Sequence, residues 1–158
     1  MENNKIFLGI DPDCEKSGVA IYFKAEKGLS LYNMGFFELY DFLQAWQKRI
    51  ASTGEDMPKI FIEAGWMNKP IWHEYHYGKN GKLVKNSAAV HATIAKKTGA
   101  NHETGRKIVE MCEYLKLDYV LIRPTETKTD ATLFKKITGY KKQTNPEQRD
   151  AAMLIWGR

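Results

Sequence analysis

The stretch KIFLGIDPDCEKSGVAIYF, residues 5–23, decides the fold. An apolar run ends in Gly-Ile-Asp at Asp11, a short polar loop follows, and a second apolar run resumes at Gly18. This pattern predicts two core strands over residues 5–11 and 18–24. An aspartate at the end of a core strand costs free energy unless its charge is paired or bound to a cation. Asp11 therefore requires a partner from elsewhere in the chain.

The rest of the sequence predicts the elements that would surround this pair. Asn145 can cap the final helix, with Pro146 at its first position and Gln148 completing a capping box. The other predicted elements are strands over 29–37, 59–64 and 119–124, and helices over 38–50, from Asn101 onward and over 129–138.

This order of elements predicts an α/β fold. Three leading strands of meander type, followed by alternating helices and strands, give a five-stranded mixed sheet with helices on both faces. The length of 158 residues indicates a single domain over 1–158. Residues 67–99 stand out as a basic and aromatic insertion, which Gly78 and Gly81 break into loop or hairpin.

Composition narrows the class of protein. Hydrophobic residues make up 43% and charged residues 27%, as in an ordinary globular protein. The sequence has neither an apolar run long enough to span a bilayer nor the layout of a secretory signal. Two cysteines, Cys14 and Cys112, fit a reducing compartment, so we expect a cytoplasmic protein without a membrane partner.

The net charge of +5 is concentrated in two lysine groups. Such groups are typical of a polyanion-binding surface, although each alone is also explained as a solvated face. Within the insertion, His73 and His76 lack two further zinc ligands, which favours a hydrogen-bonding loop over a metal site. The two groups are Lys69, Lys79, Lys82, Lys85, Lys96 and Lys97, and Lys128, Lys135, Lys136, Lys141 and Lys142.

Four acids could supply the partner that Asp11 needs. Asp11 and Glu63 each end a predicted core strand. Glu147 and Asp150 lie three residues apart, hence on one face, in the first turns of the last helix. If the two strands are neighbours and the helix crosses their ends, the four carboxylates converge and require divalent cations. Oxygen ligands suit Mg²⁺ or Mn²⁺, and two such ions can promote phosphodiester cleavage.

Each acid also has a separate structural explanation. Asp11 would be a turn residue, Glu63 a surface acid at a strand end and Glu147 a helix cap.

Four segments resemble, in the right order, motifs of the RuvC-type Holliday-junction resolvases of the ribonuclease-H-like superfamily. They are LGIDPDCEKSGVAIY (8–22), IEAGWMNK (62–69), RPTETK (123–128) and EQRDAAMLI (147–155). The resemblance implies a ribonuclease-H-like fold and cleavage of four-way junctions or related branched DNA, leaving 5′-phosphate and 3′-hydroxyl ends. It further implies two Mg²⁺ ions, for which Mn²⁺ can substitute, and a homodimer that makes symmetric cuts. Compact relatives of this kind are typical of phages and mobile elements.

The resemblance also assigns roles residue by residue. Asp11, Glu63, Glu147 and Asp150 would be the catalytic metal ligands, and Lys128 would lie against the scissile phosphate. Trp66 would stack on a base at the junction, with a core aromatic as its alternative explanation, and a solvated side chain is the alternative for Lys128. The expected DNA-binding set is Trp66, Lys69, Lys79, Lys82, Lys85 and Lys128.

Two departures from the family pattern affect the ligand set. Glu147 stands where Asp is usual, and Asp13 adds a carboxylate where Gly is usual, which binds metal through water or not at all. Three alternative functions remain to be weighed. A nuclease acting on RNA or RNA–DNA hybrid keeps the same site, and a non-catalytic junction-binding protein would have lost it. An actin-like or sugar-kinase ATPase would need two such domains, and 158 residues are too few.

Overall fold

The computed structural model describes residues 6–68 and 75–158. The strands in this part of the chain are β1 (Ile6–Asp11), β2 (Ser17–Phe23), β3 (Gly28–Met34), β4 (Lys59–Glu63), β5 (Tyr75–Tyr77), β6 (Leu83–Lys85) and β7 (Tyr119–Ile122). The helices are α1 (Phe36–Thr53), α2 (Ala88–Tyr114), α3 (Ala131–Thr138) and α4 (Pro146–Met153), with a 3₁₀ turn η1 (Gly65–Met67).

Five strands form the main sheet in the order β3-β2-β1-β4-β7. The pairs β1–β2 and β2–β3 are antiparallel, whereas β1–β4 and β4–β7 are parallel. This confirms the predicted mixed sheet, with the arrangement expected of a ribonuclease-H-like fold. Because β1 and β4 are parallel neighbours, their C-terminal ends lie at the same edge of the sheet.

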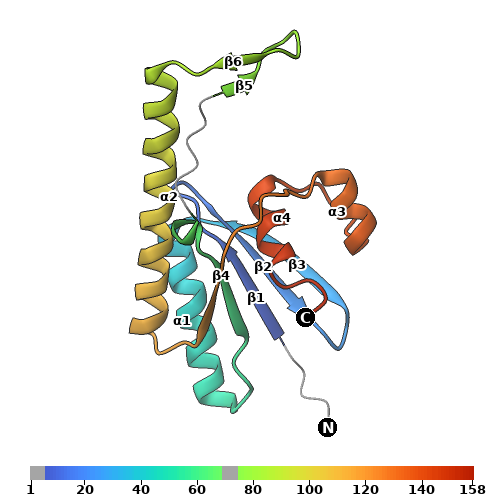
Figure 1. Ribbon diagram of the computed structural model, residues 1–158. Coiled ribbons are helices and arrows are strands. Elements are labelled where there is room, and N and C mark those ends of the chain that lie inside the picture. The colour runs from blue at the N-terminus through green and yellow to red at the C-terminus, as the bar shows by residue number, and fades with distance from the viewer. Residues whose placement is uncertain (1–5, 69–74) are drawn as a thin grey trace.

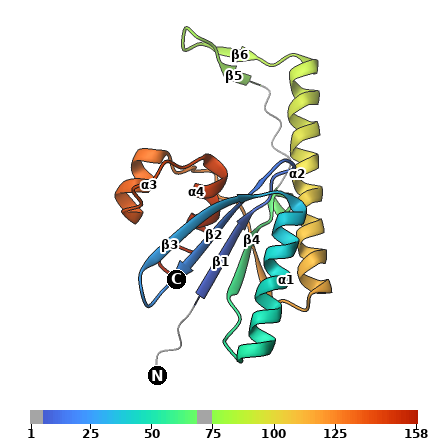
Figure 2. The ribbon, with the colours of Figure 1, turned by 180° about the vertical axis from the view of Figure 1, so that it is seen from behind.

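Helices cover both faces of the sheet, as predicted (Figures 1 and 2). Alternate residues of a strand point to opposite faces, so β1 contributes Leu8 to one core and Phe7 to the other. The first core is closed by α1 and α2, for example through Leu43 and Ile108. The second is closed by α3 and α4, where Phe134 is 1% exposed.

Several boundaries differ from the prediction, and two of the differences have a clear local cause. The third strand ends at Met34 instead of residue 37, because Gly35 is the N-cap of α1 and its backbone N–H donates to the Glu38 carboxylate. The second helix begins at Ala88, not at Asn101, and runs for 27 residues. A Ser87 cap at the true start and the helix-compatible Gly99 explain the error, since an interior glycine weakens a helix by about 1 kcal/mol without ending it.

The described residues of the insertion over 67–99 therefore belong largely to regular structure. These residues comprise the end of η1, the antiparallel hairpin β5–β6 and the start of α2. Figure 1 shows α2 extending beyond the sheet and carrying this hairpin at its far end. We call residues 75–100 the arm. Among the described residues, no helix unites the length and the hydropathy that a bilayer crossing requires.

Candidate active site

Asp11 and Glu63 meet because their strands are adjacent and in register. Ile10 of β1 pairs with Ile62 of β4, so the next residue of each strand is an acid at the same sheet edge. Asp11 is partly buried, and the Glu63 side chain is only 15% exposed. The predicted juxtaposition of the two strand-terminating acids is thus present.

The last helix brings the other two acids to this edge. Its start is fixed by the predicted capping box, in which Asn145 Oδ1 accepts from the Gln148 backbone N–H at 2.9 Å. Two glycines let α4 lie directly on the sheet. A Cβ on Gly18 would stand 2.0 Å from the Glu147 carbonyl oxygen, and one on Gly9 would stand 2.1 Å from that of Ala151. Gly18 pairs with Asp11 across the two strands, so this close approach brings the helix start beside Asp11.

Lys128 joins the cluster from the segment between β7 and α3. Its Nζ lies 2.5 Å from Asp150 Oδ2 and 3.6 Å from Glu63 Oε1. Arg149 holds the adjacent backbone, because its Nε donates to the Thr129 carbonyl at 2.9 Å. Lys128 therefore lies among the acids, while its contact with the scissile phosphate stays a prediction.

The cluster has unusual electrostatics. Burial, together with the charges of Glu63, Asp150 and Glu147 and against the opposing charge of Lys128, raises the pKa of Asp11 to about 8. Burial also raises the pKa of Glu63, although the Lys128 ammonium opposes this rise and Asp150 adds to it. Burial alone would lower the pKa of Lys128, but its hydrogen bond to Asp150 and the surrounding carboxylates raise it overall. One ammonium thus offsets only part of the negative charge.

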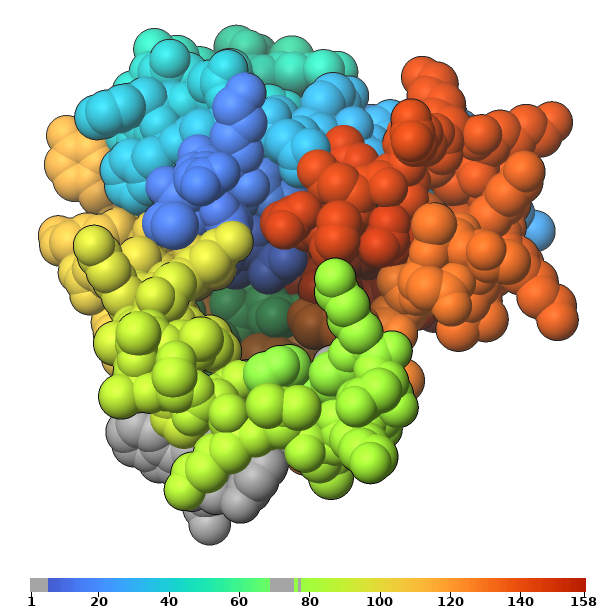
Figure 3. Space-filling view, turned by 90° about the horizontal axis from the view of Figure 1, so that it is seen from above, coloured from blue at the N-terminus to red at the C-terminus, as the bar shows by residue number. Residues whose placement is uncertain are grey.

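These side chains border a cleft of about 290 Å³. Seen from above in Figure 3, the molecule is hollowed between the arm on one side and the red α4 on the other. The cleft is lined by Asp11, Pro12, Asp13, Glu63, Gly65, Trp66, Lys97, Thr98, Asn101, His102, Lys128 and Glu147. Asp150 contacts the cleft through Lys128.

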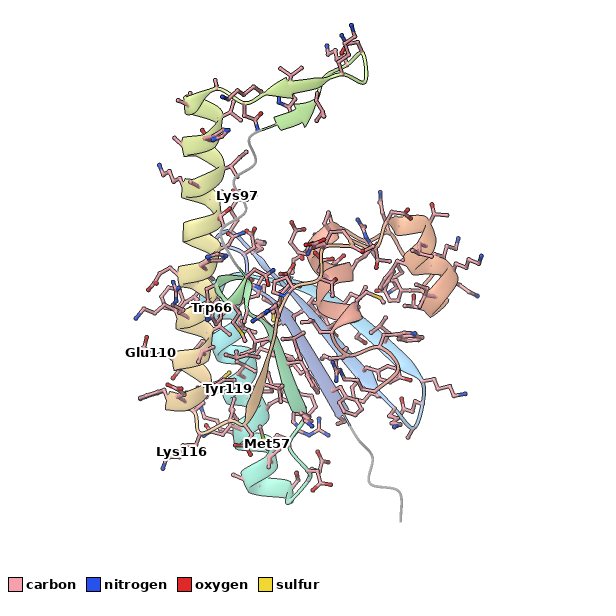
Figure 4. The ribbon with its side chains drawn as sticks, in the orientation of Figure 1. Met57, Trp66, Lys97, Glu110, Lys116 and Tyr119 are labelled. Atoms are coloured by element: carbon pink, nitrogen blue, oxygen red, sulfur yellow. The ribbon has the colours of Figure 1, made fainter. Side chains whose placement is uncertain are left out.

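Trp66 also lines the cleft, but it is half-buried and packed against α2. A Cβ on Gly105 would stand 2.4 Å from Trp66 Cζ3, and the Arg106 guanidinium lies 5.6 Å from the Trp66 ring centroid. Figure 4 shows Trp66 beside the middle of α2, with Lys97 further along the helix toward the hairpin. Packing against α2 agrees with the core-aromatic explanation of Trp66, and its place in the cleft lining leaves room for base stacking. Stacking on DNA stays a prediction.

Asp13, the additional acid, is engaged in structural hydrogen bonds. Its Oδ1 accepts from the Glu15 backbone N–H at 2.8 Å, and its Oδ2 accepts from Asn101 Nδ2 at 3.2 Å. Asn101 Oδ1 in turn accepts from the Cys14 backbone N–H at 3.0 Å. The pair Asp13–Asn101 therefore joins the β1–β2 loop to α2 at the rim of the cleft.

The predicted DNA-binding lysines are distributed unevenly. Lys69 lies outside the described residues. The hairpin lysines are exposed, and none of them is among the described residues that line the cleft. They are Lys79, Lys82 and Lys85. His73 lies outside the described residues, and His76 is hydrogen-bonded to Asn86, although it lies in β5 and not in a loop.

Sequence reasoning missed several cleft residues contributed by α2. Lys97, Asn101 and His102 all line the cleft. The sequence predicts a helix start at Asn101, so it does not indicate that these three residues share a helix face. Burial and the Arg106 guanidinium lower the pKa of His102, which disfavours the charged form of its ring. The Ser87 cap is the signal that could have located the helix start. From there, the helical spacing that links Ile108 to Asn101 and Lys97 indicates one face of the helix.

The donor chemistry of the cluster fits a hard divalent cation, since all four acids offer oxygen and Mg²⁺ prefers oxygen ligands. As the side chains stand, no three acidic, histidine or cysteine side chains among the described residues surround one point closely enough to ligate an ion together. Instead, the Lys128 ammonium bridges Glu63 and Asp150. The residues are thus suited to a metal by type, and the arrangement seen is the one held by lysine.

Comparisons with known proteins add little to this description. No protein-family model matches the sequence, and no curated protein matches it. Among solved structures, the chain is similar to RuvC of T. thermophilus in complex with a Holliday junction substrate, with 11% sequence identity and a TM-score of 0.44. The match covers 95% of this chain and 89% of that chain. At this level of similarity we draw neither an activity nor a family from it.

Proposed function

We propose that the protein is a metal-dependent, structure-selective endonuclease that cleaves phosphodiester bonds at four-way junctions or related branched DNA. The observation that carries the proposal is the convergence of four acids and one lysine, from four separate parts of the chain, at one cleft. They are Asp11, Glu63, Glu147, Asp150 and Lys128.

The four carboxylates would hold two Mg²⁺ ions, with Mn²⁺ as a substitute. Bound there, the ions would activate a water and stabilise the leaving oxygen. Asp11 and Glu63 supply oxygens from strand ends, which the sheet fixes rigidly. Glu147 and Asp150 supply oxygens from the first turns of α4, where the helix dipole favours negative charge. Lys128, at the cleft wall, would contact the phosphate that is cut.

Two observations support branched DNA as the substrate: the four motifs that resemble the resolvase family in order, and the basic residues on both sides of the cleft. The arm carries exposed lysines, and α3 with the segment after it carries four more. Lysines on both sides of the cleft would neutralise phosphates of two duplex arms, so binding would weaken steeply with salt. Because a four-way junction has two-fold symmetry, we propose that the protein acts as a homodimer.

A cleavage panel tests the proposal. Labelled four-way junction, flap, linear duplex, RNA–DNA hybrid and structured RNA are incubated with the protein and Mg²⁺ or Mn²⁺. We expect the junction or flap to be cut, and D11N to bind the same substrate without cutting it. If only the hybrid or the RNA is cut, the substrate is RNA or RNA–DNA hybrid in place of branched DNA. If the wild type binds the junction without cutting it, the protein is non-catalytic. Undiminished cutting by D11N would exclude the site itself.

A further inference from the structure

Lys128 occupies a singular position in the carboxylate cluster. Its Nζ lies between two acids from different elements, 2.5 Å from Asp150 Oδ2 and 3.6 Å from Glu63 Oε1. The two acid side chains are 14% and 15% exposed, whereas the Lys128 side chain is 58% exposed. The two carboxylates are therefore largely enclosed, and the lysine side chain between them extends in from the surface.

The oxygens that hold this ammonium are the ones that a divalent ion would need. Mg²⁺ binds carboxylate oxygens at about 2.0–2.1 Å and demands near-octahedral geometry. An ammonium hydrogen-bonded to the same Asp150 oxygen would stand within a few ångströms of that ion, where two positive charges repel. The lysine and the ion therefore compete for Glu63 and Asp150.

The surroundings of Lys128 permit its side chain to move without its backbone. The backbone is held on one side by Arg149, whose Nε donates to the Thr129 carbonyl at 2.9 Å. On the other side, Asn68 Nδ2 donates to the Pro124 carbonyl at 3.3 Å. The exposed four-carbon side chain can rotate toward the cleft that it already lines.

We propose that Lys128 is the internal counter-cation of the carboxylate cluster, and that it leaves Glu63 and Asp150 when a divalent cation binds. The proposal rests on the proposed function, since it assumes that these acids are metal ligands. It adds that Lys128 opposes metal binding, in contrast to a residue that merely supports the site. The released ammonium would then be free to meet a substrate phosphate.

The test is titration calorimetry with MnCl₂ on the full chain in the absence of nucleic acid. K128M removes the competing charge, so we expect its Kd for Mn²⁺ to fall about tenfold, which corresponds to about 1.4 kcal/mol. K128R keeps the charge and adds bidentate pairing, so its Kd should equal or exceed that of the wild type. K97M is the matched control, because Lys97 lines the same cleft without an ion pair to these acids, and its Kd should change less than twofold.

Thermal unfolding of the same variants provides a second readout. Without metal, K128M should unfold at a lower temperature than the wild type, and Mn²⁺ should raise its Tm by more. If K128M does not fold, K128Q retains a polar end without the charge and should show the same direction of change. A K128M Kd equal to or above that of the wild type would overturn the inference while leaving a metal site in place. Absence of Mn²⁺ binding in every variant would overturn both the inference and the proposed function.

Discussion

Replacing Gly18 with alanine tests how closely the fold and the site depend on each other. The added Cβ would stand 2.0 Å from the Glu147 carbonyl oxygen and 2.9 Å from the Gln148 nitrogen, both backbone atoms that cannot rotate away. Ordinary contact begins at 3.4 Å, so the first turn of α4 must shift by about 1.4 Å. This turn carries Glu147, and Asp150 follows one turn later.

The expected costs differ between stability and activity. Overpacking of this kind destabilises a protein by about 1–3 kcal/mol, which leaves a domain of ordinary stability folded. A displacement of about 1 Å at a catalytic constellation can lower the rate about 100-fold. We therefore expect Gly18→Ala to remain folded, to cut junction DNA about two orders of magnitude more slowly and to bind Mn²⁺ more weakly.

The assay compares three alanine variants by thermal unfolding, Mn²⁺ calorimetry and junction cleavage. Gly9→Ala should behave like Gly18→Ala, because its Cβ would stand 2.1 Å from the Ala151 carbonyl oxygen, next to Asp150. Gly99→Ala is the control, since its Cβ would meet no atom within 4 Å and alanine is favoured in a helix by about 1 kcal/mol. A Gly18→Ala protein with wild-type metal affinity and cleavage rate would refute the idea that the glycine places the acids.

Three further predictions follow from the charges and the thiols. In the presence of a chelator, raising the pH from 5 to 8.5 should lower the free energy of unfolding by on the order of 4 kcal/mol at most, because an Asp11 pKa raised from 3.8 to about 8 favours the folded state only while the carboxyl is protonated. In urea unfolding, D11N should lose this dependence on pH, and a wild type whose stability does not change with pH would contradict the prediction. Ellman's reagent should modify exposed Cys14 quickly and buried Cys112 only on unfolding, because burial raises the pKa of that thiol to about 12; two fast thiols would contradict this. Replacing the three hairpin lysines, Lys79, Lys82 and Lys85, with Gln should weaken junction binding and leave the Mn²⁺ Kd unchanged. The slope of log affinity against log salt concentration should become shallower by up to about 3, and an unaltered slope would exclude the hairpin from DNA contact.

The parts of the molecule that the sequence predicts correctly are those governed by local rules. Strand periodicity located β1 and β4, and the capping box located the start of α4. Parallel neighbours end on the same side, so the two strands suffice to bring Asp11 and Glu63 to one edge of the sheet. By contrast, the polar stretch up to Gly99 predicts a helix start at Asn101, which is 13 residues later than the start of α2 at Ala88.

Gly9 and Gly18 show what local rules leave out. Neither has a backbone conformation that requires glycine, and each is needed because the backbone of α4 lies against it. That helix follows Gly18 by more than a hundred residues, and nothing in the strand pattern indicates which element crosses it. The sequence marks these positions as small, and only the packing explains why.

Asp13 makes the same point for charge. From the sequence it is as acidic as Asp11 and two residues away, so it ranks as a possible metal ligand. In the structure both of its oxygens are bonded, one to the Glu15 backbone and one to Asn101, which lies 88 residues further along the chain. An acid already satisfied by neutral donors needs no cation, whereas Asp11, buried beside other acids, either keeps its proton or requires a cation to ionise. The contact with α2 therefore makes Asp13 a structural residue, while Asp11 remains the candidate metal ligand. It follows that D13N should disturb the rim of the cleft without abolishing metal binding.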